Sequence, residues 1–139
     1  MTTSTTQDAK ELAKLPVVRL QDVLLARLVV REEAARLGFA AQVLTQIATA
    51  VSEIARNVVQ HSGGSGHLSV FEIIDGGRIG LKVCVDDSGR GIGNVDHALA
   101  GTAPGAGIPG CQKLMDEFAI RSTAGIGTSV TMVKWLPRA

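Results

Sequence analysis

Aromatic residues are scarce in this chain: among 139 residues there is no tyrosine, and only three phenylalanines and one tryptophan are present. Proteins that bind single-stranded nucleic acid stack bases on such side chains, so the composition argues against a base-stacking surface. An excess of charge of one sign is absent as well, since fourteen basic and thirteen acidic residues leave a formal net charge of +1. That balance gives no broad attraction to nucleic acid or to an acidic membrane. We therefore expect neither as a partner.

Long hydrophobic runs are also absent. No apolar stretch approaches the roughly 20 residues that a membrane-spanning helix needs. Residues 1–7 are polar and are not typical of a signal peptide. The two cysteines, Cys84 and Cys111, each lie in an apolar pattern without a CxxC motif, which predicts buried thiols in a reducing compartment. The expected location is the cytoplasm.

The length suits one domain with a single core. Residues 1–14 are expected to form a flexible polar tail, and residues 15–139 a single domain. The elements expected from hydrophobic periodicity and turn residues are a strand at 17–20, helices at 22–37 and 40–61, a hairpin of strands at 67–74 and 79–85, a helix at 109–117, and strands at 118–122 and 128–135. Asp22 is expected to cap the first helix and Gly38 to end it. The predicted fold class is α+β: a two-layer sandwich with a largely antiparallel sheet and helices on one face.

The long predicted helix carries a polar pair opposite its apolar stripe. Glu53 and Asn57 are one turn apart, and the short side chains of Thr49 and Ala50 beside them leave room for a ligand. Taken alone, such a pair is typical of a solvated helix face. Beside a nucleotide, the Asn57 carbonyl oxygen would suit Mg²⁺, and Glu53 would accept the proton of an attacking hydroxyl or water.

A carboxylate follows the buried strand that ends at Val85. In Asp87-Ser-Gly89-Arg-Gly91-Ile92, the spacing Asp-x-Gly-x-Gly selects Asp87 over Asp86. A carboxylate at the end of a buried strand is placed to accept a hydrogen bond from the amino group of adenine. The alternative is a strand-ending turn in which these residues only shape the backbone.

The stretch Gly105-Ala106-Gly107-Ile108-Pro-Gly110 matches the pattern G-x-G-x-x-G. A dinucleotide-binding fold does not fit, because no buried strand precedes it and no acidic residue follows about 20 positions later. The pattern instead predicts a flexible lid over residues 93–104 that runs into a helix whose N-terminal amides face phosphates. A mobile surface loop is the alternative.

The last motif, Gly125-Ile-Gly127-Thr128, links two predicted strands. It is compatible with a plain hairpin turn, or with Thr128 contacting the base through its hydroxyl or a water. Taken together and in this order, the four motifs supply a base, a metal ligand, an acceptor for an exocyclic amine and glycine-rich backbone for phosphates. ATP with Mg²⁺ is therefore the expected ligand.

These four motifs resemble the N box and the three glycine boxes of the Bergerat-fold (GHKL) ATPases, over roughly residues 16–136. Within that superfamily, the chain looks most like the RsbT-type switch-protein serine/threonine kinases and the related anti-sigma-factor serine kinases. The stretch from Asn57 to Ser62 is closer to the second group. The resemblance implies that Glu53 is the catalytic base and Asn57 the Mg²⁺ ligand. It also implies that the nucleotide is bound by Asn57, Asp87, Gly89, Gly91, Ile92, Gly105, Ala106, Gly107, Ile108 and Thr128.

The function expected from this resemblance is a serine/threonine protein kinase that phosphorylates STAS-domain proteins in a bacterial stress-signalling, partner-switching system. Further partners implied are a phosphatase regulator or a sigma factor. Three alternatives stay open: an anti-sigma factor with serine kinase activity, a detached histidine-kinase-like ATPase domain, and a non-catalytic module that binds ATP. Arg27 and Arg31, one turn apart on the first predicted helix, either steer an acidic partner or belong to a solvated face.

Overall fold

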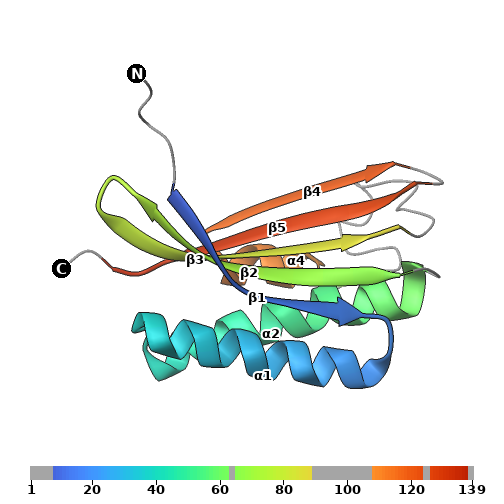
Figure 1. Cartoon of the computed structure of the whole chain (residues 1–139), viewed down its shortest axis with the longest axis horizontal. Coiled ribbons are helices and arrows are strands. Elements are labelled where there is room, and N and C mark those ends of the chain that lie inside the picture. Colours follow the sequence, from blue (N-terminus) through green and yellow to red (C-terminus); the bar gives the residue numbers. More distant parts are fainter. Residues whose placement is uncertain (1–7, 63–64, 89–107, 124–125, 138–139) are drawn as a thin grey trace.

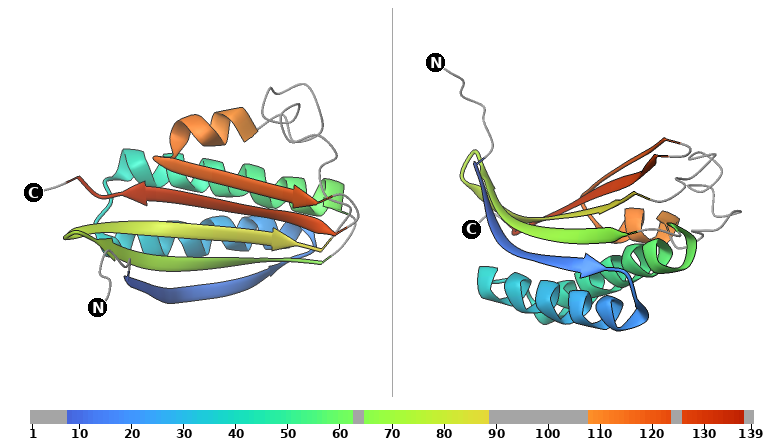
Figure 2. Two further views of the ribbon diagram at one scale, coloured as in Figure 1. Left: turned by 90° about the horizontal axis from the view of Figure 1, so that it is seen from above. Right: turned by 45° about the vertical axis from the view of Figure 1, so that its right-hand side comes forward.

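A computed structural model describes residues 8–62, 65–88, 108–123 and 126–137 of the chain. Its elements, in chain order, are β1 (Asp8–Val17), α1 (Leu20–Leu37), α2 (Ala41–Asn57), the π-helical turn η1 (Val58–Ser62), β2 (Gly66–Asp75), β3 (Arg78–Asp87), α4 (Ile108–Leu114), β4 (Glu117–Thr123) and β5 (Gly127–Trp135). Within the described residues the strands form one antiparallel sheet in the order β1-β2-β3-β5-β4. The helices cover one face of this sheet (Figure 1, Figure 2). The predicted α+β two-layer fold is confirmed.

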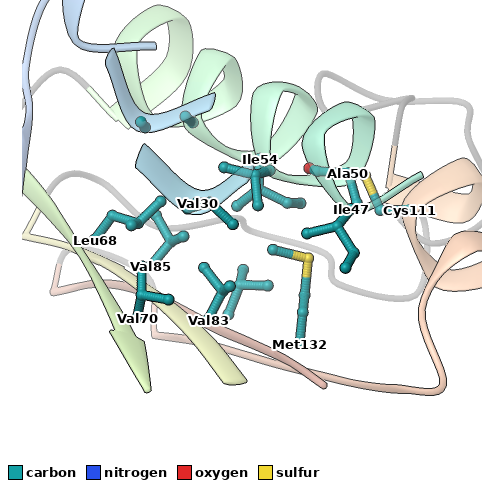
Figure 3. Close-up of a cluster of buried hydrophobic side chains, with 14 of the residues drawn as sticks. Val30, Ile47, Ala50, Ile54, Leu68, Val70, Val83, Val85, Cys111 and Met132 are labelled. Carbon is teal, nitrogen blue, oxygen red and sulfur yellow. Dashed lines mark hydrogen bonds between the residues drawn. The ribbon is translucent and has the colours of Figure 1, made fainter. Parts of the chain in front are cut away.

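The core lies between α2 and the sheet (Figure 3). Apolar residues recur along α2 at three- and four-residue steps, as the sequence pattern predicts for an amphipathic helix. From α2, Ile47, Val51 and Ile54 are at most 2% exposed. They pack against side chains that alternate along the strands, namely Leu68, Val70, Val83, Val85, Val130 and Met132. Burying each such side chain contributes about 1.5–3 kcal/mol, which fixes α2 over the sheet.

The N-terminal strand differs from the prediction. Residues 8–14 were expected in a flexible tail, but β1 begins at Asp8 and pairs with β2 from Asp8 opposite Ile74 to Val17 opposite Gly66. An edge strand is paired on one side only and remains largely exposed, so it tolerates charged residues that hide the usual strand pattern. The short strand expected at 17–20 is therefore the end of a longer one.

Helix α1 begins two residues earlier than expected, at Leu20. Asp22 lies in its first turn, and its Oδ2 accepts hydrogen bonds of 2.9 Å from the N–H groups of both Val18 and Arg19. These hydrogen bonds lower the pKa of Asp22, and the bond from the Arg19 N–H has the larger effect. The helix ends as predicted, with Gly38 in the left-handed conformation at φ 107°.

The predicted β2–β3 hairpin is confirmed, and the two strands expected at 118–122 and 128–135 pair with each other as β4 and β5. The α-helical part of α2 ends at Asn57 and continues as η1, so the long predicted helix changes its winding near its end. Helix α4 is shorter than expected, because the Asp116 N–H already donates to the Val133 carbonyl at 2.9 Å as the chain turns into β4. In the part of the chain that the structure describes, no helix is long and apolar enough to cross a membrane.

Candidate functional site

Glu53 and Asn57 lie one turn apart at the C-terminal end of α2. The Glu53 side chain is 38% exposed, and its Oε1 accepts a hydrogen bond of 3.1 Å from the Nη1 of Arg56. Arg56 was not singled out by the sequence motifs. Its i,i+3 spacing from Glu53 was the available signal, because residues three apart on a helix are neighbours. The candidate base is thus accessible and already has a charged partner.

The Asn57 amide is the most unusual polar group of this region. Its Nδ2 is buried and finds no hydrogen-bond partner among the residues that the structure describes. A buried polar group without a partner costs about 1–3 kcal/mol, so such groups are expected to meet a ligand. The amide offers an oxygen of the kind that Mg²⁺ prefers and an N–H donor for a phosphate oxygen. Asn57 therefore fits a magnesium nucleotide.

Asn57 is followed directly by the π-helical turn η1, which starts at Val58. Single π-turns are rare and occur frequently at functional sites, because the wider winding changes where the adjoining side chains lie. Here the wider turn begins one residue after the candidate metal ligand.

Asp87 and Thr128 come together at one end of the sheet. They are directly opposite in the β3–β5 pairing, and Asp87 is also opposite Gly66 in β2. Successive side chains alternate between the faces of a strand, so Asp87 shares the face of the buried Val85, which is the face that α2 covers. A Cβ at Gly127 would collide with the Asp87 carbonyl oxygen, so glycine is required for this close approach.

Asp86 lies on the other face of the sheet, where its Oδ2 is 3.7 Å from the Nε2 of His67. The structure thus separates the two neighbouring carboxylates that compete in the sequence. The Thr128 hydroxyl lies 3.1 Å from the Ser122 hydroxyl, which orients it on the Asp87 face.

Helix α4 packs against α2, with Cys111 beside Ala50 (Figure 3). The Cys111 Sγ–H donates to the Ala50 carbonyl at 3.5 Å, and Ile108 is 2% exposed. Burial, and to a smaller extent the Glu53 carboxylate, raises the pKa of the Cys111 thiol to about 12. The expectation that Ala50 leaves room for a ligand is wrong, because Ala50 is fully buried and Cys111 of α4 packs on it.

Of the two cysteines, Cys111 is buried as predicted. Cys84 is only half-buried, and its Sγ lies 3.9 Å from the Thr131 hydroxyl. The expectation of two buried thiols is wrong for Cys84, since it belongs to the sheet face that the helices leave uncovered.

Several predicted site residues lie outside the described residues: Gly89, Gly91, Ile92, Gly105, Ala106 and Gly107, together with the expected lid over 93–104. The described part of the site therefore consists of two pairs and of Ile108 at the start of α4. Glu53 and Asn57 come from α2, and Asp87 and Thr128 from the end of the sheet. Gly66 connects them, because it pairs with Asp87 and packs against Val58, the residue after Asn57.

Residues 17–134 match the histidine kinase-like ATPase domain. Over 120 residues, the chain is 38% identical to the serine/threonine-protein kinase RsbT of Bacillus subtilis. This alignment covers 83% of this chain and 90% of that protein. Over 126 residues, it is 32% identical to an anti-sigma F factor of Thermoanaerobacter sp., and this alignment covers 84% of this chain and 87% of that protein.

A solved structure containing the RsbU and RsbW domains of a Mycobacterium tuberculosis protein has the same fold, with a TM-score of 0.60 and 20% identity. The similarity covers 94% of this chain and 33% of that one. The match over 17–134 includes every described residue of the two pairs. The chain belongs to the histidine kinase-like ATPase family.

Proposed function

We propose that this protein is an ATP-dependent serine/threonine protein kinase. The observation that carries the proposal is the buried, unpartnered amide of Asn57 one helical turn from the accessible carboxylate of Glu53. The 38% identity to a serine/threonine-protein kinase supports the reaction class. In this proposal Glu53 is the catalytic base and Asn57 holds Mg²⁺.

Each residue has one task in the proposed reaction. Mg²⁺, when bound, neutralises charge on the phosphates. Asp87 accepts a hydrogen bond from the adenine amino group, and the Thr128 hydroxyl contacts the base beside it. Glu53 accepts the proton of the acceptor hydroxyl, and Arg56 orients the Glu53 carboxylate. The glycine-rich residues 105–107, with Ile108, contact the phosphates.

The outer face of α1 suits a protein partner. Leu20, Leu24 and Leu28 follow one another at four-residue steps and are 60%, 64% and 64% exposed. Arg27 and Arg31 also lie on the exposed part of this helix. Exposed apolar side chains that line up on one face mark protein contacts, and the arginines add a preference for acidic partners. We assign this leucine face, with the two arginines, to contact with a STAS-domain protein substrate.

An anti-sigma factor with serine kinase activity is the second candidate, because the chain is also 32% identical to an anti-sigma F factor. Both candidates use the same nucleotide site and differ in whether a sigma factor binds directly. A scaffold or antagonist of the STAS class is the expected substrate in both.

The test is phosphotransfer from labelled ATP with Mg²⁺ to a STAS-domain protein of the same organism. A kinase of the proposed class gives phosphoserine or phosphothreonine, which survive acid. An acid-labile product would instead indicate a histidine-kinase-like reaction. Co-purification of a sigma factor with the tagged protein would favour the second candidate.

A further inference from the structure

The junction between η1 and β2 is packed around one glycine. A Cβ at Gly66 would lie 2.5 Å from the Cγ1 of Val58, 3.0 Å from the Val17 carbonyl oxygen and 3.2 Å from the Asp86 carbonyl oxygen. Val17 and Asp86 belong to the strands paired on either side of β2, so their backbone is fixed by the sheet. The residue that would have to move for a larger side chain is therefore Val58.

Val58 is the first residue of η1 and is 7% exposed. It directly follows Asn57, whose Nδ2 has no partner among the described residues. No hydrogen bond to that nitrogen therefore holds the amide within this part of the chain. Asn57 is the last residue of α2, so the position of its amide depends on how the end of this helix is placed, and Val58 packs that end against β2.

The same glycine also borders the other half of the site. Gly66 pairs with Asp87 in the β2–β3 ladder. The preceding residue is tied to the end of β3 too, because the Ser65 carbonyl accepts a hydrogen bond of 3.0 Å from the Ser88 N–H. A larger side chain at Gly66 would therefore move Asp87 little, because the sheet holds it, and would instead push Val58 and the neighbouring Asn57 away from β2.

We infer that Gly66 is a positioning residue that sets the separation between the Asn57 amide and the Asp87 carboxylate. Its missing side chain lets Val58 approach β2, and this contact fixes the start of η1 relative to the sheet. The inference rests on the proposed function, in which one ATP molecule spans both residues. A ligand that contacts both groups depends on their separation, whereas a ligand that contacts one does not.

The experiment compares two ligands by calorimetry: ATP with Mg²⁺, which spans both groups, and adenosine, which reaches only the Asp87 end. For Gly66→Ala we expect the dissociation constant for ATP with Mg²⁺ to rise roughly tenfold, because the displaced Asn57 amide would lose about one hydrogen bond to the nucleotide. The dissociation constant for adenosine should change by less than about twofold, because the sheet holds Asp87. Adding Val58→Ala to Gly66→Ala removes the clashing Cγ1 and should restore at least part of the affinity for ATP.

The matched control is Gly80→Ala. A Cβ at Gly80 would lie 2.7 Å from the Trp135 ring and 3.0 Å from the Lys134 carbonyl oxygen, so the steric conflict is similar. Gly80 is at the other end of β3 from Asp87, and this variant should bind both ligands as the unmodified protein does. If Gly66→Ala does not fold, Val58→Ile presses on the same contact from the opposite side and is expected to show the same selective loss.

The outcomes separate the two hypotheses. An unmodified protein that binds neither ligand would overturn the proposed function, and this inference with it. The inference alone would be overturned if the unmodified protein binds both ligands and a folded Gly66→Ala or Val58→Ile variant keeps its affinity for ATP. It would also be overturned if such a variant loses affinity for both ligands equally.

Discussion

Asp87 and Thr128 lie directly opposite each other in strands β3 and β5, on the face of the sheet that α2 covers. The neighbouring Asp86 lies on the other face, beside His67. Two adjacent carboxylates are thus sent to opposite sides of the sheet by the alternation of the strand. This arrangement supplies a matched pair of variants for testing the adenine contact.

Asp87→Asn should weaken adenine nucleotide binding by about 1–3 kcal/mol, because the amide lacks the charge of the carboxylate acceptor and can direct an NH₂ group at the adenine amine. Calorimetry with ATP measures the effect. Asp86→Asn is the control and should leave the affinity unchanged. Equal affinities in the two variants would remove Asp87 from the nucleotide site.

Glu53→Ala should abolish phosphotransfer while ATP still binds, because in the proposed reaction Glu53 acts on the acceptor hydroxyl and not on the nucleotide. Phosphate transfer and ATP affinity are measured on the same preparation. The control is Glu32→Ala on α1, which removes an exposed carboxylate that pairs with Arg36 at 3.5 Å and should change neither quantity. A folded Glu53→Ala protein that no longer binds ATP would contradict the assigned role.

Cys111 should resist alkylation in the folded protein. Its pKa of about 12 leaves little thiolate at neutral pH, and its side chain is buried. Mass spectrometry after iodoacetamide treatment of a Cys84→Ser variant isolates the reaction of Cys111. Modification at the rate of an exposed thiol would show that α4 does not pack this side chain against α2.

The same pKa shift predicts a stability change at high pH. The pKa of the Cys111 thiol in the folded protein lies above its ordinary value of 9.0, so the protonated thiol favours the folded state. This contribution is fully present below pH 9.0 and is lost as the pH rises towards 12. The melting temperature of the Cys84→Ser protein should fall more steeply above pH 9.0 than the melting temperature of a protein that also carries Cys111→Ala.

Arg31→Glu should weaken binding to the STAS-domain substrate by a factor that shrinks with added salt, because the contribution is electrostatic. Leu24→Ser should weaken it at all salt concentrations, since an apolar contact is lost. ATP affinity should stay the same in both. Arg36→Ala, which removes a charge already paired with Glu32 and Glu33, is the control. Unchanged substrate binding in Arg31→Glu and Leu24→Ser would exclude the leucine face as the contact.

The parts of the fold that follow a clear hydrophobic period were predictable. The stripe on α2 and the hairpin strands bury apolar residues at regular spacing, so the sequence indicates both the element and its buried face. The charged start of β1 was not predictable in this way, because an edge strand is held by backbone pairing that leaves no side-chain period.

The candidate site shows the same limit. Glu53, Asn57 and Asp87 carry motif spacing and could be proposed from the sequence as candidates. The π-turn after Asn57 and the position of α4 over Ala50 depend on contacts between distant segments, as does the role inferred for Gly66. Local spacing cannot report such contacts.

The ion pair between Glu53 and Arg56 affects the competition between water and a protein hydroxyl for the candidate base. The Glu53 oxygen that would activate a nucleophile is occupied at 3.1 Å by a neighbour on its own helix. Pairs this exposed are worth roughly 0.2–1 kcal/mol, so a docked protein hydroxyl can displace the arginine at little cost. A water molecule brings no docking energy with it. In the proposed kinase, the pair would therefore slow ATP hydrolysis by at most about fivefold while the nucleotide waits for its protein substrate.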